Sequence, residues 1–158
     1  MKLNYRHEFN GTTDEVVALF RNPEFIEDIA KHAGALDHTV SFEGETTHLK
    51  LTLPAPDSIA KFFGKGIKIA QSFAWGDPDA DGNRQGIFTV DISGAPVAVQ
   101  ANAVLSPTGE NTSAAQYDGE LEVKIPLVGK KVEAQVEPMI KSAFAGIERR
   151  AQAWLSKG

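Results

Sequence analysis

The stretch that decides the fold runs from Val128 to Trp154 and reads VGKKVEAQVEPMIKSAFAGIERRAQAW. Its apolar residues recur every three or four positions, which is the spacing of one face of an α-helix. This apolar face covers about half of the helix circumference, whereas a helix lying on a protein surface normally shows a narrower stripe. We therefore expect a long C-terminal helix that the rest of the chain encloses on two sides.

The residues before this helix follow a period of two, which is typical of β-strands with one buried face. Residues 2–9 predict a first strand, and two short helices follow it, one capped by Thr12 and Glu15 and the other opened by Asn22 and Pro23. Glycine, proline and Asx residues then divide the remaining β region into three predicted hairpins, with strands over residues 36–44 and 46–53, 66–75 and 84–92, and 97–105 and 113–125.

Composition excludes several classes of function. The chain has 158 residues, which suits a single domain over residues 1–158, and a formal net charge of -5. An acidic chain without a basic stripe argues against a nucleic-acid partner. The absence of cysteine excludes disulfides and thiolate metal sites. No apolar run approaches the ~20 residues of a membrane span, and the first residues lack a signal-peptide core. We expect a cytoplasmic protein without metal or cofactor, and either a monomer or a dimer.

The order of strand, two helices, six strands and long helix resembles the START-like (SRPBCC) superfamily, whose members are also called helix-grip proteins. Within it, three strings are similar to an actinobacterial family of unknown function, family 2505: YRHEF at 5–9, GIFTV at 86–90 and VKIPLVGK at 123–130. The resemblance implies an α+β fold in which a curved, seven-stranded antiparallel sheet wraps around the C-terminal helix, with a cavity between them. Superfamily members include lipid-transfer domains, polyketide cyclases, hormone receptors and chaperone activators, so the resemblance assigns no activity.

Alternation along the predicted strands assigns side chains to the inner face of the sheet. Besides large apolar residues such as Leu36 and Phe42, this face receives small ones, namely Ala101, Ala103, Ala115 and Gly119. Protein interiors are densely packed, so something must fill the volume beside these small residues. Either the C-terminal helix approaches the sheet closely there, or a ligand occupies the space.

Four polar residues share the inner face: His7, His38, Gln71 and Tyr117. Pairing of the first and last strands would make His7 and Tyr117 neighbours and candidates for a polar anchor at the deep end of a pocket. Each of the four can equally be a hydrogen-bonded core or rim residue. A ligand cavity is usually apolar with a few placed polar groups, so we predict a binding site, with no catalytic or metal-binding residue assigned, made of His7, His38, Gln71, Phe73, Ala101, Ala103, Ala115, Tyr117, Met139 and Ala143.

Three functions fit this site. The first is binding or carriage of an apolar small molecule, either a lipid-like or an aromatic metabolite. The second is a cyclase or dehydratase type of enzyme, in which His7, His38 and Tyr117 would move protons. The third is an interaction protein with a filled core and an exposed apolar patch at Phe62 and Phe63.

Two loops and one charged residue have alternative interpretations. Residues 54–64 form either a lid over the pocket or a short helix that closes the core. The loop at Asp77 resembles the start of a calcium loop but lacks its final glutamate, so we interpret it as a polar turn. Arg150 falls on the apolar face of the last helix, where its charge either reaches solvent or meets an acidic ligand.

Overall fold

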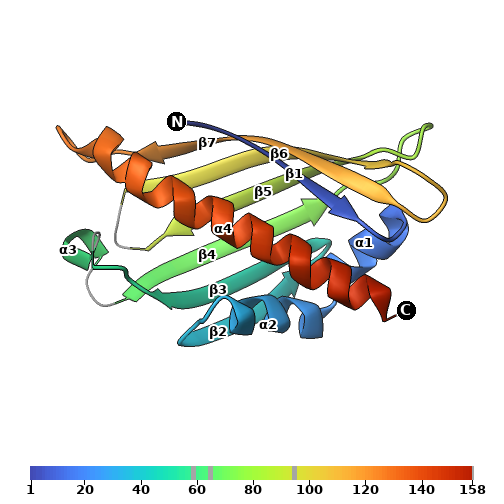
Figure 1. Cartoon of the computed structure of the whole chain (residues 1–158), viewed down its shortest axis with the longest axis horizontal. Helices are drawn as coiled ribbons and strands as arrows, with labels where there is room; N and C mark the ends of the chain where they lie inside the picture. Colours follow the sequence, from blue (N-terminus) through green and yellow to red (C-terminus); the bar gives the residue numbers. More distant parts are fainter. Residues whose placement is uncertain (58–59, 64–65, 94–95, 158) are drawn as a thin grey trace.

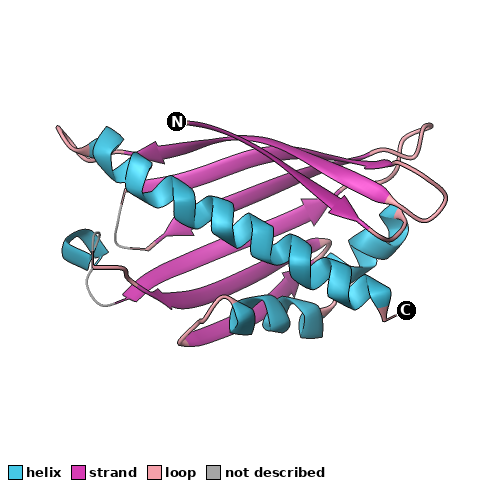
Figure 2. Ribbon diagram, viewed as in Figure 1, coloured by secondary structure: helices cyan, strands magenta, loops and turns pink. Residues whose placement is uncertain are grey.

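A computed structural model describes residues 1–57, 60–63, 66–93 and 96–157 of the chain. Its elements follow the predicted order (Figures 1 and 2), with bounds β1 Lys2–Phe9, α1 Thr13–Phe20, α2 Pro23–His32, β2 Asp37–Glu43, β3 Thr46–Pro54, α3 Ala60–Phe63, β4 Gly66–Trp75, β5 Arg84–Ile92, β6 Val97–Pro107, β7 Ser113–Val123 and α4 Gly129–Ser156. The predicted helix-grip architecture is confirmed.

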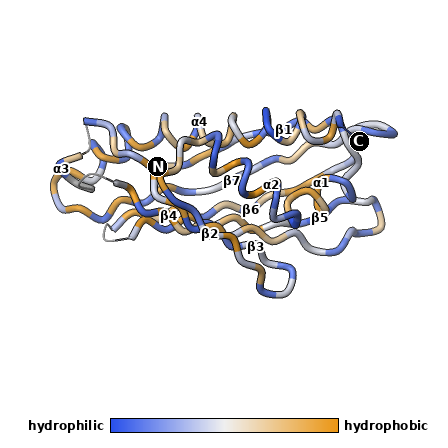
Figure 3. Tube along the Cα trace, turned by 90° about the horizontal axis from the view of Figure 1, so that it is seen from below, coloured by the Kyte–Doolittle hydropathy of each residue, from blue (hydrophilic) through white to orange (hydrophobic). Residues whose placement is uncertain are grey.

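The seven strands form one antiparallel sheet in the order β1-β7-β6-β5-β4-β3-β2. The three predicted hairpins supply three of the six neighbouring pairs, and β1 forms one edge of the sheet by pairing with β7, so that Tyr5 lies opposite Tyr117. Figure 1 shows α4 crossing one face of this sheet obliquely, with α1 and α2 at its C-terminal end and α3 at the opposite end. Polar and apolar residues alternate along α4 in Figure 3, as its helical period requires.

The two short helices begin at the predicted caps. The Thr12 hydroxyl accepts a hydrogen bond from the Glu15 backbone N–H, and the Glu15 carboxylate accepts one from the Thr12 N–H, so both members of a capping box are present. Asn22 caps α2 by accepting from the Glu24 N–H. These helices bury Phe20 and Phe25, and they fill the space between the sheet and the C-terminal half of α4.

Four large side chains lie opposite small residues on the neighbouring strand. The register pairs are Trp75 with Gly86, Phe88 with Ala101, Tyr117 with Ala103, and His7 with Ala115. A Cβ placed on Gly86 would stand 2.5 Å from the Trp75 ring, so this ring already occupies the space above the glycine. Rings of the sheet itself therefore lie opposite Ala103 and Ala115, whereas Ala101, although it is opposite Phe88, also borders a cavity.

Hydrogen bonds join one long side of α4 to the edge strand β1. The Tyr5 hydroxyl donates to Glu137 at 3.1 Å, and the His7 ring bonds the Phe144 carbonyl at 2.8 Å. Further along, the Glu8 N–H donates to the Glu148 carboxylate at 2.7 Å. We call this row of contacts the β1–α4 seam. It holds the helix against one edge of the sheet over several turns.

The opposite edge strand departs from the sequence prediction. Leu36 and Phe42 were expected to face the interior, but they are 67% and 44% exposed. Leu36 precedes β2, and Phe42 lies near the end of β2. Because β2 has a neighbouring strand on one side only, its side chains receive less cover than those of inner strands.

Candidate functional site

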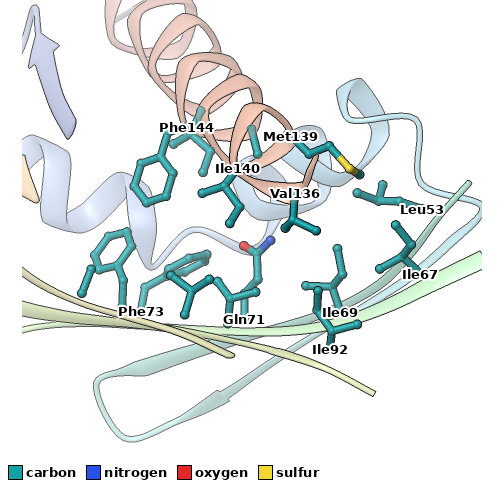
Figure 4. Close-up of a pocket in the computed structure, with 16 residues that line it drawn as sticks. Leu53, Ile67, Ile69, Gln71, Phe73, Ile92, Val136, Met139, Ile140 and Phe144 are labelled. Atoms are coloured by element: carbon teal, nitrogen blue, oxygen red, sulfur yellow. The ribbon is translucent and has the colours of Figure 1, made fainter. Parts of the chain in front are cut away.

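A cavity of about 100 Å³ lies between α4 and the inner face of the sheet (Figure 4). The lining comes from β3 to β6 and from α4: Leu53, Ile67, Ile69, Gln71, Phe73, Phe88, Val90, Ile92, Val99, Ala101, Val136, Met139, Ile140, Ala143, Phe144 and Ile147. Beyond Ile147, α1 and α2 fill the corresponding space with the main core.

The cavity wall is apolar except for one side chain. Gln71 projects from β4 toward Val136 and Ile140 of α4 (Figure 4). The residues opposite Gln71 on the neighbouring strands are Leu49 and Val90, and both have apolar side chains. Within the described part of the chain, the Gln71 carboxamide has no hydrogen-bond partner. A carboxamide that can both donate and accept therefore faces the cavity.

The cavity reaches solvent beside α4. Ala143 lines it and is nevertheless exposed, and Met139, one helical turn earlier, is half-buried. Met139 lies near Leu53 and Ile67 in Figure 4, so the opening is bounded by α4 on one side and by the ends of β3 and β4 on the other. A molecule could thus enter without separation of the β1–α4 seam.

The predicted neighbours His7 and Tyr117 are hydrogen-bonded at 3.0 Å and buried, at 2% and 1% exposure. A carbonyl oxygen only accepts, so the His7 Nε2–H donates to the Phe144 carbonyl at 2.8 Å. In the neutral ring Nδ1 is then the acceptor, and the Tyr117 hydroxyl donates to it. Both polar groups are satisfied inside the protein.

Burial controls the ionisation of this pair. It lowers the pKa of His7 to about 4, against the opposing influence of the Phe144 carbonyl and of Glu148, which both favour the charged ring. Burial also raises the pKa of the Tyr117 phenol, and the negative charge of Glu148 adds to the effect. At neutral pH the pair is therefore an uncharged hydrogen-bonded unit.

Aromatic rings separate this pair from the cavity. Phe144 packs on His7 with ring centroids 5.4 Å apart and on Tyr117 at 5.1 Å, while Phe88 packs on Tyr117 at 5.0 Å. Phe88 and Phe144 line the cavity, whereas His7 and Tyr117 do not. The polar anchor expected at the deep end of the pocket is thus behind an aromatic wall, where it ties β1, β7 and α4 together.

The remaining predicted site residues divide into two groups. Gln71, Phe73, Ala101, Met139 and Ala143 line the cavity. The other three lie elsewhere: the rings of Tyr117 and His7 stand opposite Ala103 and Ala115, and His38 lies on the edge strand β2 opposite Leu51.

The predicted site left out Ile67, Ile69 and Val90, which also line the cavity. It also left out Val136, Ile140 and Phe144, although they lie on the same apolar helix face as Met139 and Ala143. The spacing of three or four residues along this face was the signal that could have found them.

Arg150 has neither of its two expected partners. Its Nε–H donates to the Asp28 carboxylate of α2 at 2.7 Å, and the Trp154 indole N–H donates to the same oxygen at 2.9 Å. Burial alone would raise the pKa of Asp28, but these two donors outweigh it and the pKa is lowered. We call this group the α2–α4 clamp, because it fastens the C-terminal half of α4 to α2.

Some expectations fall on residues outside the described ranges. Residues 60–63 form the helix α3, but 58–59, 64–65 and the side chains of Phe62 and Phe63 lie outside the description. The lid and the exposed patch predicted there are therefore not described. Over the described ranges, no three His, Cys, Asp or Glu side chains converge as a metal site would require. None of the described helices combines the length and apolarity that a membrane crossing needs.

Comparison with solved structures shows that the fold is shared widely. Norcoclaurine synthase from Thalictrum flavum, in complex with a transition-state analogue, superposes with a TM-score of 0.63 at 16% identity, covering 99% of this chain and 94% of that chain. The Zhui aromatase/cyclase from Streptomyces sp. R1128 gives 0.65 at 8% identity over 99% and 94%. A conserved protein from Geobacillus kaustophilus gives 0.62 at 17% identity over 99% and 96%. At these identities the likeness concerns the fold alone.

Sequence comparison identifies the family. No curated protein matches the chain. A family model, described as a protein of unknown function (DUF2505), matches residues 4–155, which is nearly the whole of the chain. The chain therefore belongs to the DUF2505 family and has the helix-grip fold that norcoclaurine synthase and the aromatase/cyclase share.

Proposed function

We propose that this protein binds or carries an apolar small molecule in the cavity between the sheet and α4. The observation that carries the proposal is an apolar cavity that opens to solvent beside Ala143 and contains one carboxamide, Gln71, without a protein partner. Burial of apolar ligand surface supplies the affinity, and a few polar groups fix the orientation of the ligand. The ligand is a lipid-like or aromatic metabolite, and the site residues are those that line the cavity.

An enzyme of the cyclase or dehydratase type is the second candidate, since norcoclaurine synthase and an aromatase/cyclase share the fold. Proton transfer needs an acid or base within reach of the bound substrate. His7 and Tyr117 are committed to each other and to a backbone carbonyl behind the aromatic wall, and His38 lies on the edge strand. The binding function is therefore favoured. The cytoplasmic location stays a prediction, as do the actinobacterial source and the choice between monomer and dimer.

Binding can be tested by filling the cavity from its exposed side. Ala143→Phe places a ring at the opening without replacing a buried side chain, and Ala134→Phe is a matched control, because Ala134 is exposed on the same helix and does not line the cavity. The affinity of the fluorescent hydrophobe N-phenylnaphthylamine would be measured for the wild type and both variants. Native mass spectrometry of the freshly purified protein would show any co-purifying molecule.

We expect Ala143→Phe to weaken binding of the dye at least about tenfold, because the added ring competes for the same space, while Ala134→Phe binds as the wild type does. A co-purifying apolar molecule should be retained by the wild type and the control, and lost from Ala143→Phe. Equal dye affinity in all three proteins would place binding outside this cavity and refute the proposal.

A further inference from the structure

We infer that the enclosed part of this cavity's ligand is neutral and has a single internal hydrogen-bonding group, such as a ketone or an alcohol, flanked by apolar parts on both sides. This inference rests on the proposed binding function and narrows it to a class of ligand. It follows from the chemistry of the wall, from the surroundings of Gln71 and from its place along the cavity.

The wall contains no charge. Among the sixteen residues that line the cavity, all of them within the described ranges, none is ionisable. An ion without a counter-charge or sufficient hydrogen bonds is costly to bury. A carboxylate head group placed in this cavity would meet one amide and otherwise hydrocarbon. The cavity thus selects against a charge at the depth of Gln71, whereas a charged head group outside the opening stays in water.

The Gln71 side chain is half-buried, and within the described part of the chain its carboxamide bonds to no other group. A ligand that enclosed this amide without bonding to it would leave a buried amide unpaired, at a cost of about 1–3 kcal/mol. The neighbours Leu49, Val90 and Ile140 offer it no polar atom. A ligand carbonyl would accept from the carboxamide NH₂, and a hydroxyl would donate to its oxygen.

The position of Gln71 makes the ligand's polar group internal. Along β4, Ile69 and Ile67 lead toward the opening, where Leu53 and Met139 add aliphatic surface. In the other direction Phe73 begins the aromatic end, which Phe88 and Phe144 complete. Two residues along a strand span about 6.6 Å. Apolar wall therefore extends from Gln71 both ways, with an aromatic end inside and an aliphatic end at the opening.

Hexanophenone has this distribution, with a phenyl ring, one carbonyl and a pentyl chain, and hexylbenzene is its counterpart without the carbonyl. The isomer 2-phenylhexanoate, called phenylhexanoate below, supplies a comparable anion whose charge lies between the ring and the chain. Their dissociation constants would be measured by displacement of N-phenylnaphthylamine from the wild type and from Gln71→Met, which keeps the length of the side chain without its hydrogen bonds. Gln100→Met is the matched control, because Gln100 is exposed on the outer face of β6.

The dissociation constant of hexylbenzene is divided by that of hexanophenone, and this ratio is compared between the wild type and each variant. The two compounds differ in hydration by the same amount in every case, so a change in the ratio reports only the contact with the carbonyl. We expect Gln71→Met to lower this ratio about two- to tenfold, the worth of one net hydrogen bond, and Gln100→Met to leave it unchanged. Phenylhexanoate at neutral pH should bind at least about tenfold more weakly than hexanophenone.

An unchanged ratio in Gln71→Met, or phenylhexanoate binding as tight as that of the ketone, would overturn the inference while hexylbenzene binding kept the proposed function intact. If none of the three compounds displaced the dye, both the inference and the proposed function would fail. Hexylbenzene binding to Gln71→Met also reports that the variant is folded and its cavity open.

Discussion

Acid should destabilise this protein through His7, whose ring is neutral in the folded state. The ordinary pKa of 6.5 applies in the unfolded chain, whereas burial lowers the pKa to about 4 in the folded protein. Between these two values the unfolded state binds a proton that the folded state does not bind. Stability from this group is therefore complete above pH 6.5 and falls as the pH decreases toward 4.

The magnitude follows from the difference in pKa. One unit corresponds to about 1.4 kcal/mol, so a decrease from 6.5 to about 4 withdraws about 3 kcal/mol from the free energy of unfolding. This is a large part of the 5–15 kcal/mol that is typical of a domain. Asp28 affects stability at lower pH than His7 does. Because its pKa is lowered in the folded protein, the stability that it contributes is complete above the ordinary carboxyl pKa of 3.8 and is lost only below that pH.

Urea unfolding at a series of pH values between about 7 and 4.5 would measure this effect. His7→Gln stays neutral, so it should be less stable at neutral pH but lose much less on acidification. His48→Gln is the control, since the His48 side chain is 36% exposed. If His7→Gln lost as much stability as the wild type over this range, the reasoning would be refuted. Should that variant fail to fold, an NMR titration of wild-type His7 showing a pKa near 6.5 would refute it equally.

Three further substitutions test other contacts. Tyr117→Phe removes the donor to His7 Nδ1 and should cost about 1–3 kcal/mol of unfolding free energy in urea at neutral pH; no change would mean that the bond contributes nothing. Gly86→Ala brings a Cβ to 2.5 Å from the buried Trp75 ring and should lower stability by about 1–3 kcal/mol, with a changed tryptophan emission spectrum, whereas an unaltered melting temperature would contradict the packing described. Asp28→Asn weakens the α2–α4 clamp and should cost about 1 kcal/mol at low ionic strength and less in high salt; a salt-independent loss would argue against an electrostatic cause.

The sequence was sufficient for the fold because periodicity, caps and turn residues all indicated the same elements. The period of two along the strands identifies a face, and the capping box at Thr12 and the Asn22 cap identify where helices begin. The burial of a side chain on an edge strand, however, depends on which other elements of the fold pack against that strand. Phe42 has the same parity as buried inner-face residues, yet β2 has a neighbour on one side only.

The candidate site was harder to predict, because its shape depends on which side chains lie opposite each other. Ala103 and Ala115 were interpreted as the border of a void, and the register instead places Tyr117 and His7 opposite them. A shift of two residues would keep every side chain on its face and still change which residues lie opposite each other, and alternation alone does not distinguish these two registers. Gln71 was identified correctly as an inner-face residue, but the lack of a partner is visible only once Leu49 and Val90 are seen beside it.

The attachment of α4 along one edge of the sheet has a consequence for the movement of this helix. Bonds from Tyr5, His7 and Glu8 fix one long side of the helix, while its other side borders the cavity opening. Any movement of the helix that widened this opening while the seam stayed intact would have to break the α2–α4 clamp. A ligand too bulky for the opening would then exchange at a rate that depends on ionic strength, even though the cavity itself carries no charge.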